Sequence, residues 1–451
     1  MGQFYKLRDI ALKGKNGMKI IYDIVAVGVG PIHLALAVAV TEGAGSPRIS
    51  KDRVLLVEAK NQFEWHSGMQ IPGAGMQTPF LKDLVSQFNP CSEFTFLNYL
   101  REKGRLNDFI NLRQLYPSRR EFEDYFAWAA SKLSSMIQYG QVVLSIERTL
   151  ASENDEPIYT VTAQQLIDGE ICKYYARAVS LGIGMTPILP SSATADMQCL
   201  IHSSDFAHRM PALFPDILAP INILIVGAGQ SGAEIYLHLL RTYPNARISI
   251  ASRGFVFRSA DANSFVNDLF KDETAIATHD LEDSSREYLR RDLRNSNYAA
   301  VDEALIQTIR AELYEQSILG EIRGEQLSYT SLLQVRSMRS GLAATLKFQL
   351  TGATEERGYD TIICATGFDD SAMRKIIQPF DNGAIKNNAG MLTTDVNFRL
   401  NHSIQPDNNI YLQGYTDALV DSTIICNLGC RAHRVVADIA ARLSGYEHND
   451  R

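Results

Sequence analysis

Cysteine is scarce and scattered in this chain of 451 residues. No CxxC pair and no disulfide-like framework occurs among the six cysteines, which are Cys91, Cys172, Cys199, Cys364, Cys426 and Cys430. This pattern argues against a dithiol redox centre and is typical of proteins of the reducing cytoplasm, where we expect this chain. The nine histidines are equally dispersed, without an HExxH motif, so we expect no metal site.

Long apolar runs and an excess of positive charge are also absent. No run approaches the roughly 20 residues that cross a bilayer, and the first twenty residues lack the apolar core of a signal peptide. We therefore expect no membrane span. Lys and Arg number 44 against 51 Asp and Glu, and the net charge of −7 argues against nucleic acid or an anionic membrane as a partner.

A strand, a glycine turn and a helix follow one another near the N-terminus. The apolar run 23–27 leads into Gly-Val-Gly-Pro at 28–31, and an apolar helical pattern follows at 34–40. A second apolar run covers 53–58. Because a helix connects the two strands, the strands must be parallel, and the unit is the βαβ element of dinucleotide-binding domains.

The residue types in this first turn suit a nucleotide. Gly28 permits the tight turn, Gly30 lets the backbone approach a pyrophosphate, and the helix that begins near Pro31 offers free N–H groups to it. Glu58 ends the second strand, where a carboxylate can accept ribose hydroxyls. His33 occupies the third glycine position, so the GxGxxG pattern is incomplete here.

The same unit returns in the middle of the chain, where the pattern is complete. After the apolar run 221–226 the turn consists of Gly227, Ala228, Gly229, Gln230, Ser231 and Gly232. The following strand, 246–251, leads into Ser252-Arg253 rather than into an acid. An acid there favours the ribose of NAD, whereas Arg253 can pair with a 2′-phosphate, so this turn favours NADPH over NADH.

The two units together predict an α/β protein with two Rossmann-like dinucleotide-binding domains. We assign the N-terminal unit to FAD and the middle unit to NADPH. We expect the NADPH domain to be inserted into the FAD domain, with a small substrate-binding region between them. The FAD domain is assigned to residues 19–218 and 377–451. The NADPH domain is assigned to residues 219–376, which include a substrate-contacting segment at 255–325.

One FAD site and one NADPH site describe a reductase or a monooxygenase. A dithiol reductase needs a redox cysteine pair beside the flavin, and the sequence has none. A monooxygenase needs only a closed apolar flavin pocket, because the cofactor carries the chemistry. A flavoprotein that binds FAD without turnover is a third reading of the same turns.

Several unusual segments narrow these alternatives. They are Phe63-Glu64-Trp65-His66, Met76-Gln77-Thr78-Pro79-Phe80-Leu81-Lys82-Asp83-Leu84, Asn89-Pro90, Asp108-Phe109-Ile110-Asn111, Tyr116-Pro117-Ser118-Arg119, Phe265-Val266-Asn267-Asp268-Leu269-Phe270, Asn297-Tyr298 and Ala365-Thr366-Gly367-Phe368. Together they resemble the flavin-dependent N-hydroxylating monooxygenases that act on the side-chain amine of L-ornithine or L-lysine. The resemblance extends over about 22–443, and Asn111, Asn267 and Asn297 are more similar to the ornithine enzymes.

The resemblance implies a reaction and a set of roles. NADPH reduces FAD, dioxygen forms a C4a-hydroperoxyflavin, and the neutral side-chain amine of L-ornithine takes one oxygen atom, for hydroxamate siderophore or related natural-product biosynthesis. Gln77 would lie beside the flavin, Lys82 would pair with the substrate carboxylate, and Asn267 and Asn297 would hydrogen-bond the substrate or the nicotinamide ribose. The catalytic candidates are Gln77, Lys82 and Asn297, and the cofactor-binding set also takes in Trp65, His66, Thr366 and Gly367.

Two departures from the family pattern bear on the substrate. The family commonly has Asn where this chain has His33, next to the FAD turn. Cys426 stands where the family has a substrate-contacting serine, and a thiol is a poorer hydrogen-bond partner. L-Lysine, a diamine such as putrescine, or another amino acid's α-amine therefore remain alternatives to L-ornithine. Relatives commonly form dimers or tetramers, so we expect a homo-oligomer.

Overall fold

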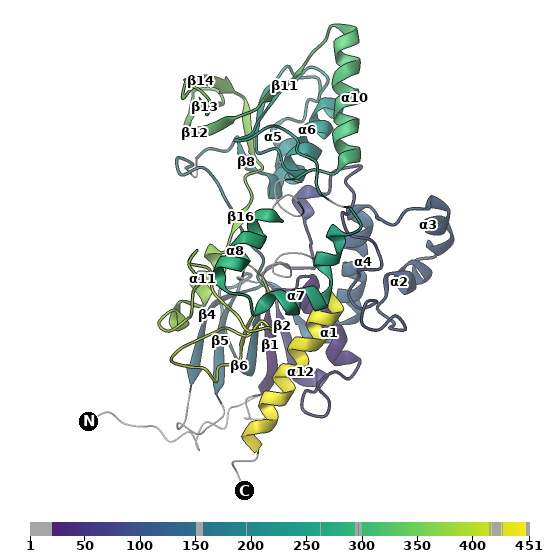
Figure 1. The fold of residues 1–451 in the computed structure, drawn as a ribbon, viewed down its shortest axis with the longest axis vertical. Helices are drawn as coiled ribbons and strands as arrows, with labels where there is room; N and C mark the ends of the chain where they lie inside the picture. Colours follow the sequence, from purple (N-terminus) through teal and green to yellow (C-terminus); the bar gives the residue numbers. More distant parts are fainter. Residues whose placement is uncertain are drawn as a thin grey trace, which may run out of the picture.

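The computed structural model describes residues 20–149, 157–194, 196–261, 263–293, 296, 300–414, 416, 425 and 427–447. Two sheets organise these residues, one in the lower and one in the upper half of Figure 1. Among the described residues, none of the helices is both long and apolar enough to cross a membrane.

The first sheet has seven strands and holds the N-terminal βαβ unit. Its order is β3-β2-β1-β6-β5-β4, and β17 pairs with β6. The strands β1, β2, β3, β6 and β17 pair in parallel, whereas β4, β5 and β6 pair antiparallel. The bounds are β1 (Ile21–Val27), β2 (Val54–Val57), β3 (Ile137–Gln138), β4 (Gln141–Thr149), β5 (Ile158–Gln165), β6 (Ile171–Leu181) and β17 (Ile410–Leu412).

The second sheet is parallel throughout and holds the second βαβ unit. Its order is β11-β10-β9-β15-β8. These strands are β8 (Leu200–His202), β9 (Asn222–Val226), β10 (Arg247–Ala251), β11 (Gly324–Leu327) and β15 (Thr361–Cys364). A smaller antiparallel sheet joins β12 (Thr330–Ser337), β13 (Leu342–Phe348) and β14 (Thr354–Tyr359). The predicted fold class, two Rossmann-like domains in one α/β chain, is confirmed.

The chain crosses between the two sheets at a pair of short strands. β7 (Thr186–Pro187) runs toward the second sheet, β16 (Phe368–Asp369) returns from it, and the two pair antiparallel. β8 belongs to the second sheet because it pairs with β15, although it precedes the expected boundary at 218/219. Met373, before the expected boundary at 376/377, packs in the core of the first sheet. We propose that the domains divide at β7 and β16.

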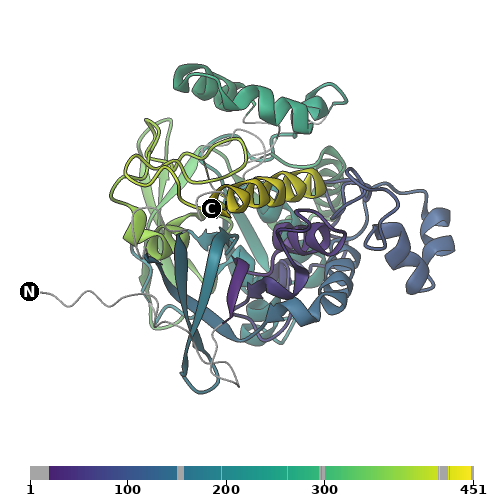
Figure 2. The same cartoon turned by 90° about the horizontal axis from the view of Figure 1, so that it is seen from below.

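Helices cover the sheets and the space between them. They are α1 (Pro31–Thr41), α2 (Phe96–Glu102), α3 (Leu106–Leu112), α4 (Arg119–Lys132), α5 (Phe206–Leu213), α6 (Gln230–Thr242), α7 (Asp272–His279), α8 (Asp283–Asp292), α10 (Glu303–Leu319), α11 (Ser371–Ile376) and α12 (Leu428–Glu447). Short 3-10 turns are η2 (Lys51–Arg53), η3 (Ser67–Met69), η4 (Ser134–Met136), η5 (Ser203–Asp205), η6 (Val266–Phe270) and η7 (Gln378–Phe380). The α2–α3 pair projects from the body of the molecule (Figures 1 and 2).

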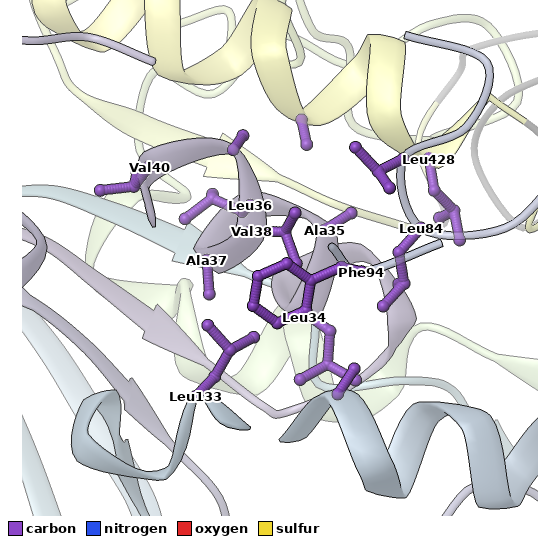
Figure 3. Packing of buried hydrophobic residues seen from close by; sticks show 14 of the residues in the cluster. Leu34, Ala35, Leu36, Ala37, Val38, Val40, Leu84, Phe94, Leu133 and Leu428 are labelled. Atoms are coloured by element: carbon purple, nitrogen blue, oxygen red, sulfur yellow. The ribbon is translucent and has the colours of Figure 1, made fainter. Parts of the chain in front are cut away.

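The helix of the first turn, α1, is apolar on all sides, which predicts burial on all sides. Nine of its eleven residues are buried. Figure 3 shows its side chains meeting Phe94, Leu133 and Leu428, which come from three separate parts of the chain. The yellow helix α12 lies along it in Figures 1 and 2. The start of α1, and with it the first glycine turn, is thus fixed by packing.

Candidate functional site

The first glycine turn has the backbone geometry that the sequence predicts. Gly28 has a φ of 92°, and a Cβ there would lie 2.5 Å from the carbonyl oxygen of Gly182, so no other residue fits. Its N–H donates to Val57 at the end of β2 (2.8 Å). Helix α1 then begins at Pro31 with Gly30 as its N-cap and no side-chain cap. The positive end of the helix is therefore open to an anion.

Glu58 is held over this turn. Its carboxylate accepts hydrogen bonds from the backbone N–H groups of Val29 (2.7 Å) and Lys60 (3.0 Å). The two bonds fix the carboxylate beside the turn, and each oxygen keeps a further lone pair for a hydroxyl donor. This is the place at which a nucleotide ribose would meet it.

Trp65 and His66 form an aromatic pair on the first domain. The rings meet edge to face with centroids 4.4 Å apart, and Trp65 also packs against Phe126 at 5.2 Å. His66 is accessible, yet the protein around it lowers its pKa to about 4, and the positive charges of Arg119 and Lys60 act in the same direction. His66 is therefore neutral at neutral pH, and the pair presents an uncharged aromatic surface.

The second glycine turn repeats the first in a tighter form. Gly227 has a φ of 108°, and a Cβ there would lie 2.2 Å from the carbonyl oxygen of Ala365. Helix α6 begins at Gln230 with Gly229 as its N-cap. A Cβ at Gly232 would lie 2.0 Å from the carbonyl oxygen of Gly227, so the third glycine lets the helix touch the turn. The complete pattern in the sequence thus corresponds to a complete nucleotide turn.

One large cavity, of about 1950 Å³, joins this second turn to residues of the first domain. Ten of the residues selected from the sequence line it: Gln77, Lys82, Gly227, Gly229, Gln230, Ser231, Arg253, Asn267, Thr366 and Gly367. The other described candidates, Gly28, Gly30, Pro31, Glu58, Trp65 and His66, belong to the first domain and are not among its lining residues. Asn297, with its neighbour Tyr298, and Cys426 lie outside the described residues.

Lys82 and Asn267 come from different domains and meet at this cavity. The Lys82 ammonium lies 5.8 Å from the ring centroid of Phe270, on the same short turn η6 as Asn267. The side chain of Asn427 fixes η6 by donating to the carbonyl of Phe270 (2.8 Å). Asn427, with a φ of 63°, also exchanges hydrogen bonds with Gln87. Asn427 is a positioning residue that the sequence did not reveal, because the contact joins segments 157 residues apart.

A buried ion pair connects the first domain to the helix of the second turn. Arg119, at the start of α4, donates twice to the carboxylate of Glu234 on α6 (2.9 Å each) and once to the carbonyl of Met69 (2.8 Å). Their side chains are only 13% and 4% exposed. Glu234 also accepts from the side chain of Gln230 (2.9 Å), whose carbonyl accepts from the N–H of Asp302. The sequence marked Arg119 and Gln230 but gave no signal for Glu234.

The segment 266–292 reaches from the second domain to the first. Besides the Asn427 contact, Asp272 on α7 pairs with Arg434 on α12 (3.0 Å). His279 donates from Nε2 to the carbonyl of Thr394 (2.9 Å). Figure 1 shows α7 beside α12, below the second domain. This segment lies within the predicted substrate-contacting stretch, and two of its residues, Asn267 and Phe270, line the cavity.

His33 is fully buried inside the first turn. Its Nδ1 donates to the carbonyl of Gly28 (2.7 Å), and its Nε2 accepts from the hydroxyl of Ser180 on β6 (2.8 Å). A carbonyl oxygen can only accept, so the ring carries its proton on Nδ1. Burial, together with the nearby positive charge of Arg431, lowers its pKa to about 4.

We expect acid to destabilise the protein partly through His33. An ordinary histidine has a pKa of 6.5. Between pH 6.5 and about 4, His33 is therefore protonated in the unfolded chain but neutral in the folded chain. The lowering corresponds to about 3 kcal/mol of stability, present above pH 6.5 and lost as the pH falls to 4. His33→Asn should therefore show a flatter decline of urea-unfolding midpoints between pH 7 and 4, whereas replacing the exposed His208 should leave the decline as in the wild type. Parallel curves for wild type and His33→Asn would contradict this.

The fold and site define a two-nucleotide oxidoreductase, with one dinucleotide turn on each domain. The family model described as L-lysine 6-monooxygenase/L-ornithine 5-monooxygenase matches residues 20–370. The chain belongs to this family, which confirms the resemblance seen in the sequence and the prediction of a flavin-dependent N-hydroxylating monooxygenase.

Known relatives agree over nearly the whole chain. The chain is 33% identical to the L-ornithine N(5)-monooxygenase of Burkholderia cepacia, covering 94% of each protein. It is 31% identical to the L-ornithine N(5)-oxygenase of Arthrobotrys oligospora, covering 96% of this chain and 91% of the relative. Among solved structures, the ornithine hydroxylase PvdA of Pseudomonas aeruginosa aligns with a TM-score of 0.86 at 30% identity, over 94% of this chain and 100% of that one.

A second solved structure was determined with ligands. The ornithine N-hydroxylase KtzI of Kutzneria sp. 744, with reduced FAD, NADP⁺ and L-ornithine, aligns with a TM-score of 0.86 at 28% identity. The alignment covers 94% of this chain and 99% of that one.

Proposed function

We propose that this chain hydroxylates the side-chain amine of L-ornithine with FAD, NADPH and dioxygen. The observation that carries the proposal is the cavity in which the second nucleotide turn and Arg253 face Gln77 and Lys82 of the first domain. A hydride donor bound at that turn and a substrate bound at Lys82 would share one cavity. The named activities of the relatives support the choice of ornithine.

The residues around the first turn fit FAD. The glycine turn at Gly28, the open start of α1 and the carboxylate of Glu58 provide a pyrophosphate cradle and a ribose acceptor. Trp65 and His66 add an uncharged aromatic surface on the same domain. Bound there, FAD would supply hydride acceptance and dioxygen activation, and these residues would hold and orient it.

The substrate would be recognised by charge and by hydrogen bonds. Lys82 supplies the cation that a carboxylate needs on leaving water, and Asn267, on the facing turn η6, supplies neutral donors and acceptors. We assign Asn297 and Cys426 to the same substrate site and Gln77 to the flavin side of the cavity. The reacting amine must be neutral because an ammonium has no lone pair, so turnover should rise with pH.

Arg253 should set the preference for NADPH. It follows β10 and lines the cavity beside the second turn, where it can pair with a 2′-phosphate. Arg253→Ser should raise the KM for NADPH about 10- to 100-fold and change the KM for NADH little, since a charge-assisted bond contributes about 1.5–3 kcal/mol. Arg247→Ser, at the opposite end of the same strand, is the matched control. Equal losses with both nucleotides would contradict the assignment.

The proposal is tested by offering the enzyme several amines with NADPH and oxygen. Hydroxylamine product should form with L-ornithine and be much lower with L-lysine, putrescine and other amino acids. Product from a different amine would replace ornithine but keep the reaction, and product from none would refute N-hydroxylation. If the wild type did not turn over ornithine and the Cys426→Ser variant did, the result would favour the different-amine alternative.

We propose that the enzyme acts in the cytoplasm, where NADPH is available, and that it forms a homo-oligomer, a dimer or a tetramer. Its product would serve hydroxamate siderophore or related natural-product biosynthesis. Light scattering of the purified enzyme tests the oligomer.

A further inference from the structure

The two glycine turns of this chain pack their third position in different ways. In the second turn Gly232 brings the helix against the carbonyl of Gly227, and the methyl group of Ala365 lies beside both. A Cβ built on either glycine would lie 3.5 Å from that methyl group. A small residue on the helix is thus matched by a small side chain at the end of β15.

The first turn places a large side chain at the same position. His33 stands where Gly232 stands, and its imidazole donates to the Gly28 carbonyl, the counterpart of the Gly227 carbonyl. Gly182 is the counterpart of Ala365, because a Cβ on the preceding turn glycine would strike its carbonyl oxygen in each case. A Cβ on Gly182 would lie 2.8 Å from Cε1 of His33, so the imidazole occupies the space that a methyl group fills in the second turn.

We propose that His33 is a positioning residue for FAD, and that His33 and Gly182 act as a matched pair replacing the Gly–Ala pair of the second turn. The imidazole connects the Gly28 carbonyl to Ser180 on β6, so the pyrophosphate turn is fixed to the first sheet through a side chain. Ser180 is itself between two strands, paired with Ala26 on β1 and Tyr411 on β17. The inference rests on the proposed function, in which this turn binds FAD.

The matched pair predicts which substitutions weaken FAD binding. His33→Ala leaves the Gly28 carbonyl and the Ser180 hydroxyl without the imidazole, and should weaken FAD binding about 10-fold or more. Gly182→Ala pushes the imidazole from its place and should have a similar effect. Ser180→Ala removes only the Nε2 partner and should have a smaller effect, of about 3-fold.

The decisive variant combines His33→Gly with Gly182→Ala, which reproduces the packing of the second turn. We expect the double variant to bind FAD within about 3-fold of the wild type, far more tightly than either single variant, because neighbouring substitutions are not additive. Affinity is measured as flavin released on dilution of the holoenzyme, followed by flavin fluorescence. Binding of NADP⁺ to the FAD-saturated variants tests the second turn and should match the wild type in all of them.

The role of His33, the His33–Gly182 pair and FAD binding itself are tested by different outcomes. Wild-type protein that holds FAD, together with His33→Ala that holds it equally well, would overturn the role of His33 alone. A double variant whose loss equals the combined losses of the single variants would overturn the matched pair. Wild-type protein that holds no FAD would overturn the proposed function and this inference with it.

Discussion

Lys82→Met is expected to raise the KM for ornithine about 100-fold or more, because a desolvated carboxylate would lose its charged partner. The ammonium of Lys82 lies on the cavity wall near η6. Among the described residues, no acidic side chain forms an ion pair with it. Methionine keeps most of the length and the apolar stem of lysine and removes the ammonium with its charge and donors. Steady-state kinetics with varied ornithine measures the effect.

The flavin half-reaction separates this role from a structural one. Reduction of the flavin by NADPH, measured by stopped-flow absorbance without ornithine, should change less than about 3-fold, since the Lys82 charge is proposed to act on ornithine and not on NADPH. Lys103→Met is the matched control: Lys103 pairs with Asp124 at the surface and is not among the residues that line the cavity. An unchanged KM for ornithine, or an equal fall in flavin reduction, would place Lys82 outside the substrate site.

Glu234→Gln is expected to lower the free energy of unfolding by about 3–5 kcal/mol, the usual effect of removing one partner of a buried ion pair. Arg119 would keep its cation in a largely buried site with only the Met69 carbonyl and a neutral amide nearby. Glu234 also holds Gln230 at the start of α6, so the second turn should lose its fixed distance from the first domain. Flavin reduction by NADPH should slow about 10-fold or more.

The matched control for this variant is an exposed pair. Arg336 and Glu356 also form a short ion pair (2.7 Å), but their side chains are 56% and 55% exposed. Glu356→Gln should change stability by less than about 0.5 kcal/mol. Urea unfolding and stopped-flow reduction of both variants provide the comparison. Similar stability for the two variants would contradict a stabilising role for the buried pair.

The sequence predicted the parts of the fold and site that depend on local pattern. Both βαβ units are predictable because glycine spacing, strand hydrophobicity and helix periodicity are local features. The same holds for Arg253, since the end of the second strand in a known unit lies beside the turn. The other nine predicted site residues that line the cavity, Gln77 and Lys82 among them, were identified by motif rather than by geometry.

What the sequence did not predict depends on contacts between distant segments. β8 has only three residues, and its membership of the second sheet is decided by pairing with β15, 162 positions later. Glu234 is an ordinary helix residue until Arg119 is brought against it. Gly182 carries no motif, and only the buried imidazole of His33 explains why a side chain is excluded there.

The pairing of β7 with β16 has a consequence for how such a chain could arise. Thr186 lies opposite Asp369, so the residues at which the chain leaves and re-enters the first domain are neighbours in space. A segment whose two ends meet can be spliced into a host loop at little entropic cost, because the host loop is not stretched to accommodate it. With the domains divided at β7 and β16 as proposed, the intervening residues form an inserted segment, and a short linker from Pro187 to Phe368 would join the two parts of the first domain without a long span.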